Sequence, residues 1–165
     1  MKKVILIGFA TSGKSSVGKL LAKKLGAKFV DTDAEIERDC DMTIRQIFDA
    51  HGEAYFRQKE NDLLLTLAPL QDVVIACGGG SVAAESFAQL AKGSVVIWLT
   101  ATASTVKRRL GGVQRPLFDR LDERELQQFI DVRTPLYERY AEIAVPTDNL
   151  SVEQVAENAY LKLKS

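Results

Sequence analysis

Several features are scarce or missing in this sequence of 165 residues. No apolar run reaches the roughly 20 residues that a membrane-spanning helix needs. The short apolar run near the start leads directly into Gly13-Lys14-Ser15, so we do not interpret it as a targeting signal. Lysine plus arginine and aspartate plus glutamate each total 22, which gives a net charge of zero. The sequence therefore favours neither a nucleic acid nor a membrane as a partner.

Cysteine is also rare. Only Cys40 and Cys77 occur, and their spacing is not that of a metal site. We interpret them as reduced thiols, which predicts a cytoplasmic protein. Hydrophobic residues make up 46% of the chain, enough for a folded core. Its length and the lack of a linker predict a single domain over residues 1–165.

Short apolar runs alternate with stretches of helical periodicity along the chain. This alternation predicts an α/β fold, with a mostly parallel sheet and helices on both faces. The capping-box patterns Thr43-x-x-Gln46 and Ser151-x-x-Gln154 predict two helix starts, and Pro135 is expected to interrupt a late helix. Ligands of such sheets bind beyond the carboxyl ends of the strands. The expected strands are 3–7, 28–31, 73–76, 94–99 and 143–145, and helical patterns include 17–25, 83–91 and 152–163.

The segment that follows the first apolar run matches the phosphate-loop pattern G-x-x-x-x-G-K-[ST], from Gly8 to Gly13-Lys14-Ser15. Backbone N–H groups of such a loop, and the helix start behind it, bind phosphate. Lys14 would contact the β- and γ-phosphates, and Ser15 would offer its hydroxyl to Mg²⁺. A plain glycine-rich turn is the alternative. The Asn-Lys-x-Asp guanine reader of small GTPases is absent, and no aspartate ends a second apolar strand of the ATPase kind.

Two aspartates, Asp31 and Asp33, lie at the end of the second expected strand. Residues two apart in extended chain point to the same side, so we expect both carboxylates near the phosphate loop. Asp31 would face the Mg²⁺ shell, and Asp33 would accept a hydrogen bond from an attacking hydroxyl. The alternative is that Asp33 only caps the next helix.

Charged residues also occupy apolar helix positions. Glu60 lies on the apolar stripe of its helix, with Arg57 one turn before it, and Arg133 lies in an apolar position of a later helix. Two arginines near apolar surface can bind a carboxylate, because each guanidinium can donate two parallel hydrogen bonds. The alternative is structural: an Arg57–Glu60 ion pair, and an Arg133 that extends to water.

Glycine is concentrated in two further places. The run Gly78 to Gly80 ends the third strand, which suits the close approach of a ligand or of another backbone. Gly111 and Gly112 open a segment, residues 111–120, that we expect to act as a mobile lid. This lid would carry Arg115 and Arg120 and close Arg115 over the γ-phosphate of a nucleotide. A solvated basic loop is the alternative.

These motifs, in this order, resemble the shikimate kinase family. The resemblance rests on "GFATSGKSSVGKLLAKKLG", "FVDTD", "TIRQIFDAHGEAYFRQKE", "ACGGGSV", "RPLF" and "RTPLYERYA", which together run along nearly the whole chain. It implies a single-domain P-loop kinase fold of the nucleoside-monophosphate-kinase type, with a five-stranded parallel sheet. It also implies a mostly monomeric, Mg²⁺-dependent enzyme that transfers the γ-phosphoryl group of ATP to the 3-hydroxyl of shikimate.

The resemblance further implies a role for each matching residue. ATP would be bound by Thr11, Ser12, Gly13, Lys14, Ser15 and Ser16, with Arg115 closing over it and Arg108 stacking on adenine. Ser15 and, through water, Asp31 would serve the metal. Shikimate would be bound by Asp33, Arg57, Gly78, Gly79, Gly80 and Arg133, with Glu60 anchoring Arg57. Lys14, Asp33 and Arg115 would act in catalysis.

The sequence departs from the family pattern in a few places. Phe118 replaces the last leucine of the usual Arg-Pro-Leu-Leu, which should alter packing more than chemistry, and Ala10 and Thr11 stand where glycine is common. The adenine-side segment 145–154 is variable, so base contacts there are open. Another small-molecule kinase of this fold, such as gluconate kinase, is one alternative function. A nucleotide-binding module without transfer is a second, and a nucleic-acid-binding protein a third.

Overall fold

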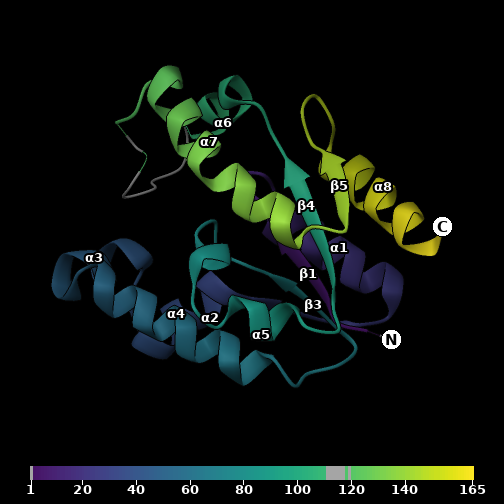
Figure 1. Ribbon diagram of the computed structural model, residues 1–165, viewed down its shortest axis with the longest axis horizontal. Coiled ribbons are helices and arrows are strands. Elements are labelled where there is room, and N and C mark those ends of the chain that lie inside the picture. Colours follow the sequence, from purple (N-terminus) through teal and green to yellow (C-terminus); the bar gives the residue numbers. More distant parts are fainter. Residues whose placement is uncertain (1, 111–117, 119) are drawn as a thin grey trace.

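A computed structural model describes residues 2–110, 118 and 120–165. Its centre is a single sheet in which every strand pairs in parallel with its neighbours, in the order β2-β3-β1-β4-β5 (Figure 1). The predicted five-stranded parallel sheet is thus confirmed, and each predicted strand is correct to within one residue at either end. The strands are β1 Val4–Ile7, β2 Lys28–Asp31, β3 Val73–Ala76, β4 Val95–Thr100 and β5 Ile143–Pro146.

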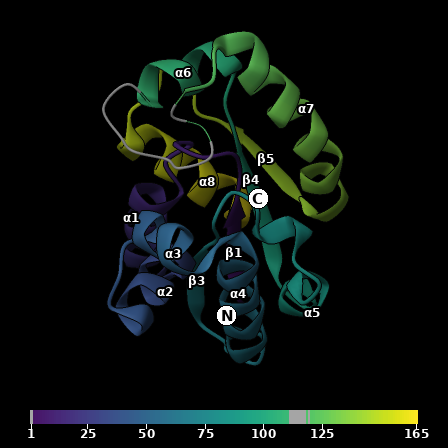
Figure 2. The ribbon, with the colours of Figure 1, turned by 90° about the vertical axis from the view of Figure 1, so that its left-hand side faces the viewer.

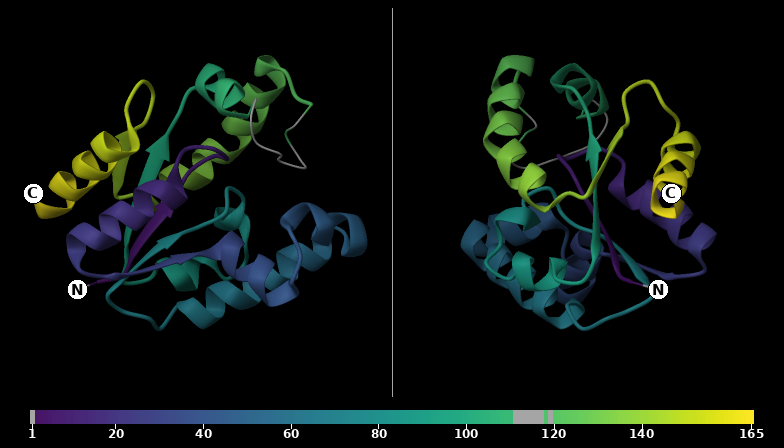
Figure 3. Two further views of the ribbon diagram at one scale, coloured as in Figure 1. Left: turned by 180° about the vertical axis from the view of Figure 1, so that it is seen from behind. Right: turned by 45° about the vertical axis from the view of Figure 1, so that its right-hand side comes forward.

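Helices cover both faces of this sheet, as the alternating pattern predicts (Figure 3). On one face α1 and α8 enclose a cluster that includes Leu6, Leu21 and Val155; on the other, α4, α5 and α7 enclose one that includes Ile75 and Leu90. The helices are α1 Lys14–Leu25, α2 Thr32–Cys40, α3 Ile44–His51, α4 Glu53–Leu67, α5 Phe87–Ala91, α6 Ala103–Leu110, α7 Glu123–Tyr140 and α8 Val152–Lys164, with a short 3-10 turn η1 Ser81–Ala83.

Two predicted helix starts are confirmed in atomic detail. Thr43 caps α3 and Ser151 caps α8, and each forms both hydrogen bonds of a capping box with the glutamine three residues on. The helix predicted over residues 83–91 is divided instead into η1 and α5. Asn61 of α4 explains the break, because its amide oxygen accepts from Ser86 N at 2.9 Å and its carbonyl accepts from Ser86 Oγ at 3.0 Å.

The expectation that Pro135 interrupts a helix is wrong, since α7 continues through it from Glu123 to Tyr140. Proline lacks the N–H that would bond to the carbonyl four residues back. The preceding Thr134 adds a side-chain bond, donating from Oγ1 to Ile130 O at 2.8 Å. Tyr137 and Leu126, both fully buried, hold α7 on either side of this point, so packing maintains the helix where local preference would end it.

The arrangement leaves two groups of helices on opposite sides of the carboxyl ends of β1 and β3 (Figure 2). α2, α3 and α4 form one group, while α6 and α7 form the other, around a smaller cluster of Phe9, Val106 and Leu126. Among the described residues, no helix has the length and apolar character needed to cross a membrane.

Candidate active site

The phosphate-loop segment connects β1 to α1, as its sequence pattern requires. Two of its glycines are needed for different reasons. Gly13 has a φ of 91°, a left-handed conformation that glycine adopts without strain, and it starts α1. At Gly8 a Cβ would lie only 2.5 Å from the carbonyl oxygen of Leu99, so glycine is the residue that lets the loop pass close to β4. The loop therefore presents its backbone at the carboxyl end of β1.

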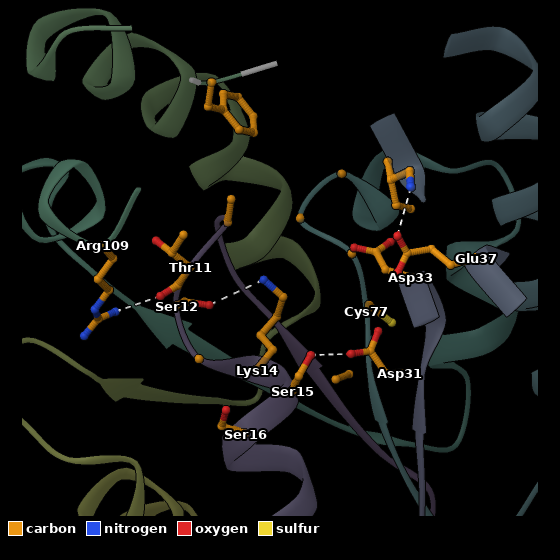
Figure 4. A pocket seen from close by; sticks show the side chains of 18 of the residues that line it. Thr11, Ser12, Lys14, Ser15, Ser16, Asp31, Asp33, Glu37, Cys77 and Arg109 are labelled. Carbon is orange, nitrogen blue, oxygen red and sulfur yellow. Dashed lines mark hydrogen bonds between the residues drawn. The ribbon is translucent and has the colours of Figure 1, made fainter. Parts of the chain in front are cut away.

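Lys14 curls over this loop and is nearly buried (Figure 4). Its Nζ donates to Gly8 O at 2.7 Å and Phe9 O at 3.0 Å, and it lies 3.4 Å from Ser12 Oγ. These contacts hold a positive charge above the hollow of the loop. An anionic group bound there would meet both this ammonium and the N-terminal end of α1.

Ser15 and Asp31 lie side by side, and the Ser15 hydroxyl donates a hydrogen bond to the Asp31 carboxylate (Figure 4). Two adjacent oxygen donors next to a phosphate-binding loop are of the kind that Mg²⁺ prefers. The described residues contain no group of three or more His, Cys, Asp or Glu side chains suited to a metal ion. A magnesium ion held here would thus take most of its remaining ligands from phosphates and water, which is usual for Mg²⁺ at nucleotide sites.

The two aspartates do not follow one extended strand, as the sequence spacing suggested. β2 ends at Asp31, and α2 begins at Thr32, so Asp33 lies in the first turn of that helix. Asp31 is the N-cap, and its carboxylate accepts from Ala34 N at 3.2 Å. The alternative in which Asp33 merely caps the helix is therefore wrong. Asp33 instead points into the same cavity as Lys14 (Figure 4).

The glycine run after β3 has a clear steric cause. Each of the three glycines faces one residue that the sequence predicts to bind the substrate. A Cβ at Gly78 would lie 2.6 Å from Asp33 Oδ1, one at Gly79 3.2 Å from Arg133 Nη1, and one at Gly80 2.9 Å from Arg57 Nη1. Any larger residue would displace these side chains. The three glycines thus form a floor against which a carboxylate and two guanidinium groups pack.

Arg57 forms the ion pair that the helical periodicity suggested. Its Nη1 lies 3.0 Å from Glu60 Oε1, and the other oxygen of Glu60 accepts from Ser81 Oγ at 2.8 Å. Glu60 is only 1% exposed. A buried carboxylate needs such partners, so the pair fixes Arg57 against α4. Arg57 also lines the cavity, which means that the ion pair and a ligand-binding role are compatible.

Arg133 is half-buried and lines the cavity. Its Nη1 is buried and has no hydrogen-bond partner in the described part of the chain. Next to it, the hydroxyl of Tyr137 donates a hydrogen bond to Gly79 O at 2.7 Å. Burial raises the pKa of Tyr137 to about 12, although Arg133 acts in the opposite direction, so this hydroxyl keeps its proton at neutral pH.

One cavity of about 1070 Å³ brings the candidate residues together. Arg108 does not line it and is exposed on α6, whereas the neighbouring Arg109 does. The predicted Arg115 and most of the lid segment, residues 111–117 and 119, lie outside the described residues. The cavity is lined by the candidates Thr11, Ser12, Gly13, Lys14, Ser15, Ser16, Asp31, Asp33, Arg57, Gly78, Gly79, Gly80 and Arg133.

Arg109 connects two walls of the cavity. It donates to Thr11 O at 3.0 Å, on the side of the phosphate loop (Figure 4). It also donates to Thr147 O at 3.1 Å and so joins this loop to the segment after β5. Burial lowers the pKa of Arg109, but an arginine remains charged at neutral pH. The geometry therefore favours Arg109 over Arg108 as the arginine near a bound nucleotide. The sequence held a signal for Arg109. Ala103, Val106 and Leu110 form the apolar stripe of α6, and Arg109 lies beside this stripe because it follows Val106 by three residues.

Sequence reasoning also missed Glu37 and two aromatic residues, Phe48 and Phe56, that line the cavity. Glu37 accepts from Ile44 N at 2.9 Å and so ties α2 to the start of α3. Cys77, at the end of β3, is buried, and this burial raises the pKa of its thiol above the ordinary value. The thiol is therefore protonated at neutral pH and a poor nucleophile.

Comparison with known proteins gives a consistent result. A family model described as shikimate kinase matches residues 10–164. A protein named shikimate kinase in Thermodesulfovibrio yellowstonii is 41% identical over 160 residues, covering 95% of this chain and 92% of that protein. The structure of shikimate kinase from Acinetobacter baumannii in complex with shikimate matches with a TM-score of 0.91 and 31% identity, covering 99% of this chain and 93% of the other. A gluconokinase from Sinorhizobium meliloti 1021 is similar in fold alone, with a TM-score of 0.64, 20% identity and coverage of 99% and 91%.

Proposed function

This chain belongs to the shikimate kinase family, and we propose that it transfers the γ-phosphoryl group of ATP to the 3-hydroxyl of shikimate, giving shikimate 3-phosphate for aromatic amino acid synthesis. The observation that carries this proposal is the shared cavity. Arg57 and Arg133 line the same hollow as the phosphate loop and pack on Gly80 and Gly79. Phosphoryl transfer needs donor and acceptor sites that meet in this way.

On the donor side, the loop from Thr11 to Ser16 binds the ATP phosphates through backbone N–H groups. Lys14 exchanges its contacts with Gly8 O and Phe9 O for the β- and γ-phosphate oxygens, which are stronger partners for an ammonium. Ser15 would hold Mg²⁺ through its hydroxyl, and Asp31 would do so through water. When bound, this ion neutralises charge on the β- and γ-phosphates.

On the acceptor side, Arg57 and Arg133 bind the ring carboxylate of shikimate, and backbone of Gly78 to Gly80 lies against the ring. This clamp orients the 3-hydroxyl toward the γ-phosphate. Asp33 accepts the hydrogen bond of that hydroxyl and takes its proton as the new P–O bond forms. The bond from the γ-phosphorus to the β,γ-bridging oxygen breaks at the same time, and ADP leaves with that oxygen. The Asp33 carboxylate packs against Gly78 in the same cavity, which supports this role.

Further parts of the proposal concern residues and properties beyond this geometry. Arg109 is our candidate for the adenine side, in place of Arg108. The role of Arg115 and the mobile lid over residues 111–120 that would carry it stay predictions. A single kinase domain over residues 1–165, a monomeric state and a cytoplasmic location stay predictions too. We also propose that neither nucleic acid nor a membrane is a partner.

The first experiment measures ADP release with Mg²⁺ and a panel of polyhydroxylated acids. Shikimate should be the acceptor that stimulates release, while gluconate should not, because the two arginines and three glycines form a site for a rigid carboxylate. Release with gluconate alone would favour the gluconate kinase alternative. Binding of ATP without any acceptor-dependent release would instead indicate a nucleotide-binding module.

A substitution tests the acceptor side directly. Asp33→Asn should lower kcat by about 100- to 10,000-fold with the fold retained, because an amide cannot accept the hydroxyl proton. Steady-state kinetics and thermal unfolding would measure this. Asp39→Asn on the same helix is the matched control, since Asp39 is exposed and does not line the cavity. Near-normal turnover of Asp33→Asn would reject the role of Asp33.

A further inference from the structure

The guanidinium of Arg133 rests on two phenylalanine rings. Its Cζ lies 5.2 Å from the ring centroid of Phe9 and 5.3 Å from that of Phe118. The two rings touch each other, with centroids 4.9 Å apart and planes tilted by 44°. Both distances are within the range of a cation–π interaction, so Phe9 and Phe118, here called the aromatic pair, attract this positive charge.

The aromatic pair joins three separate parts of the chain. Phe9 belongs to the phosphate-loop segment, Phe118 precedes α7, and Arg133 lies in the middle of α7. Phe9 is 4% exposed and Phe118 is 6% exposed, so the side of the guanidinium that faces the rings is shielded from water. Phe129, one turn before Arg133 on α7, packs edge-on against Phe118, with ring centroids 5.4 Å apart.

The environment of Arg133 differs from that of Arg57 in one important respect. Arg57 is partly neutralised by Glu60 at 3.0 Å, while Nη1 of Arg133, next to Gly79, is buried and has no hydrogen-bond partner among the residues that the structure describes. Ring faces orient a guanidinium through their quadrupole, yet they do not satisfy its N–H donors. Arg133 is thus held in place with hydrogen-bonding capacity left for a ligand.

We propose that the aromatic pair preorganises Arg133 to bind the acceptor's carboxylate, and that Phe118 is therefore a positioning residue for acceptor affinity. This proposal rests on the proposed function, in which Arg133 is one arm of the carboxylate clamp. Preorganisation increases affinity because the side chain loses less conformational freedom on binding. It also gives a specific role to Phe118, which stands where the family usually has leucine.

The test compares Phe118→Leu with Phe129→Leu. The rings of Phe118 and Phe129 touch each other, but of these two residues only Phe118 makes a cation–π contact with Arg133. Phe129 is 42% exposed and does not line the cavity. Binding is followed by the fluorescence of Trp98, the single tryptophan of the sequence. Its ring centroid lies 5.7 Å from that of Tyr137, which lies next to Arg133. Shikimate titrations then give Kd independently of turnover, and steady-state kinetics give both KM values and kcat.

Phe118→Leu should raise the Kd and KM for shikimate by about three- to tenfold, with the KM for ATP unchanged. Phe129→Leu should change them by less than about twofold, since it removes no cation–π contact with Arg133. In an Arg133→Ala background, Phe118→Leu should have no further effect on shikimate binding, because the ring would act only through the guanidinium. A simple packing role would instead persist in that background.

Three results would overturn the proposal: an unchanged shikimate Kd in Phe118→Leu, an equal change in Phe129→Leu, or an undiminished effect in the Arg133→Ala background. Failure of the proposed function looks different. If the wild type binds shikimate but transfers no phosphoryl group, the transfer proposal fails, and the Kd series still decides the role of Phe118. If the wild type does not bind shikimate, both proposals fail.

Discussion

At the scale of the residue, the phosphate-loop segment contains one with a strained backbone conformation. Thr11, in the phosphate-loop segment, has a φ of 66°, a left-handed conformation that β-branched residues rarely adopt. Its Oγ1 is also buried and without a hydrogen-bond partner among the described residues. Both features are destabilising. Strain of this kind is concentrated at functional sites, where binding outweighs its cost.

Thr11→Gly should therefore stabilise the free protein. Relief of the left-handed strain, about 1–2 kcal/mol, outweighs the extra backbone entropy of glycine in the unfolded chain, about 0.5–1 kcal/mol. A net gain of about 1 kcal/mol would raise Tm by about 2–4 °C. Thermal unfolding without ligands measures it. Ala54→Gly, in the first turn of α4, is a control of opposite sign, because there glycine should only destabilise. A lower Tm for Thr11→Gly would contradict the strain argument.

At the scale of secondary structure, α7 shows how one helix serves both packing and the site. It contains Arg133, the buried Tyr137 that donates to Gly79 O, and Pro135 between them. A proline inside a helix removes a hydrogen bond and usually bends the helix. Pro135 is thus a costly residue in the segment that sets the position of Arg133 relative to Tyr137.

Pro135→Ala should raise stability and weaken acceptor binding together. Alanine restores the N–H that can bond to Asp131 O and removes the ring clash, for a gain of about 1–3 kcal/mol in unfolding free energy. The altered helix should shift Arg133 away from Gly79 and raise the KM for shikimate several-fold. Urea denaturation and steady-state kinetics measure the two effects. Gln128→Ala, an exposed position of the same helix, should change neither. Higher stability with an unchanged KM would show that Pro135 does not position Arg133.

At the scale of the whole molecule, loops from both halves of the chain meet beyond the sheet. Arg109 joins the phosphate loop to Thr147, and Asp148 accepts from Thr102 N at 3.1 Å and Thr102 Oγ1 at 2.9 Å. These bonds tie the β5–α8 loop to the β4–α6 loop. Burial would raise the pKa of Asp148, but hydrogen bonds from Thr105 and Thr102 outweigh it, so the pKa is lower than usual.

This lowered pKa predicts a pH-dependent contribution to stability. A carboxyl group whose pKa is lower in the folded state stabilises the fold above its unfolded pKa, about 4, and the contribution is lost as the pH falls through the folded pKa. Asp148→Ala should thus be less stable than wild type at neutral pH, with a difference that shrinks below about pH 4. Urea denaturation across this range measures it. Thr102→Val, which removes one donor, should show the same trend at smaller size. A difference that stays constant with pH would refute the argument.

The sequence by itself determined the class of fold and identified most of the candidate residues that line the cavity. Local periodicity determines the strands, capping residues such as Thr43 and Ser151 start helices, and the phosphate-loop pattern depends on neighbouring residues. Glu60 and Arg133 could also be recognised from the sequence as candidate site residues, because a charged residue on the apolar stripe of a helix needs a partner or a ligand.

Only the tertiary structure decided how these pieces meet. It placed Asp33 in a helix turn rather than on a strand, put Arg109 rather than Arg108 at the cavity, kept α7 intact through Pro135 and set Phe118 against Arg133. Each outcome depends on contacts between residues far apart in the chain, such as Asn61 with Ser86 or Phe9 with Phe118. Such contacts override local preference because burial and hydrogen bonding across the fold contribute more than the few tenths of a kcal/mol that separate local conformations.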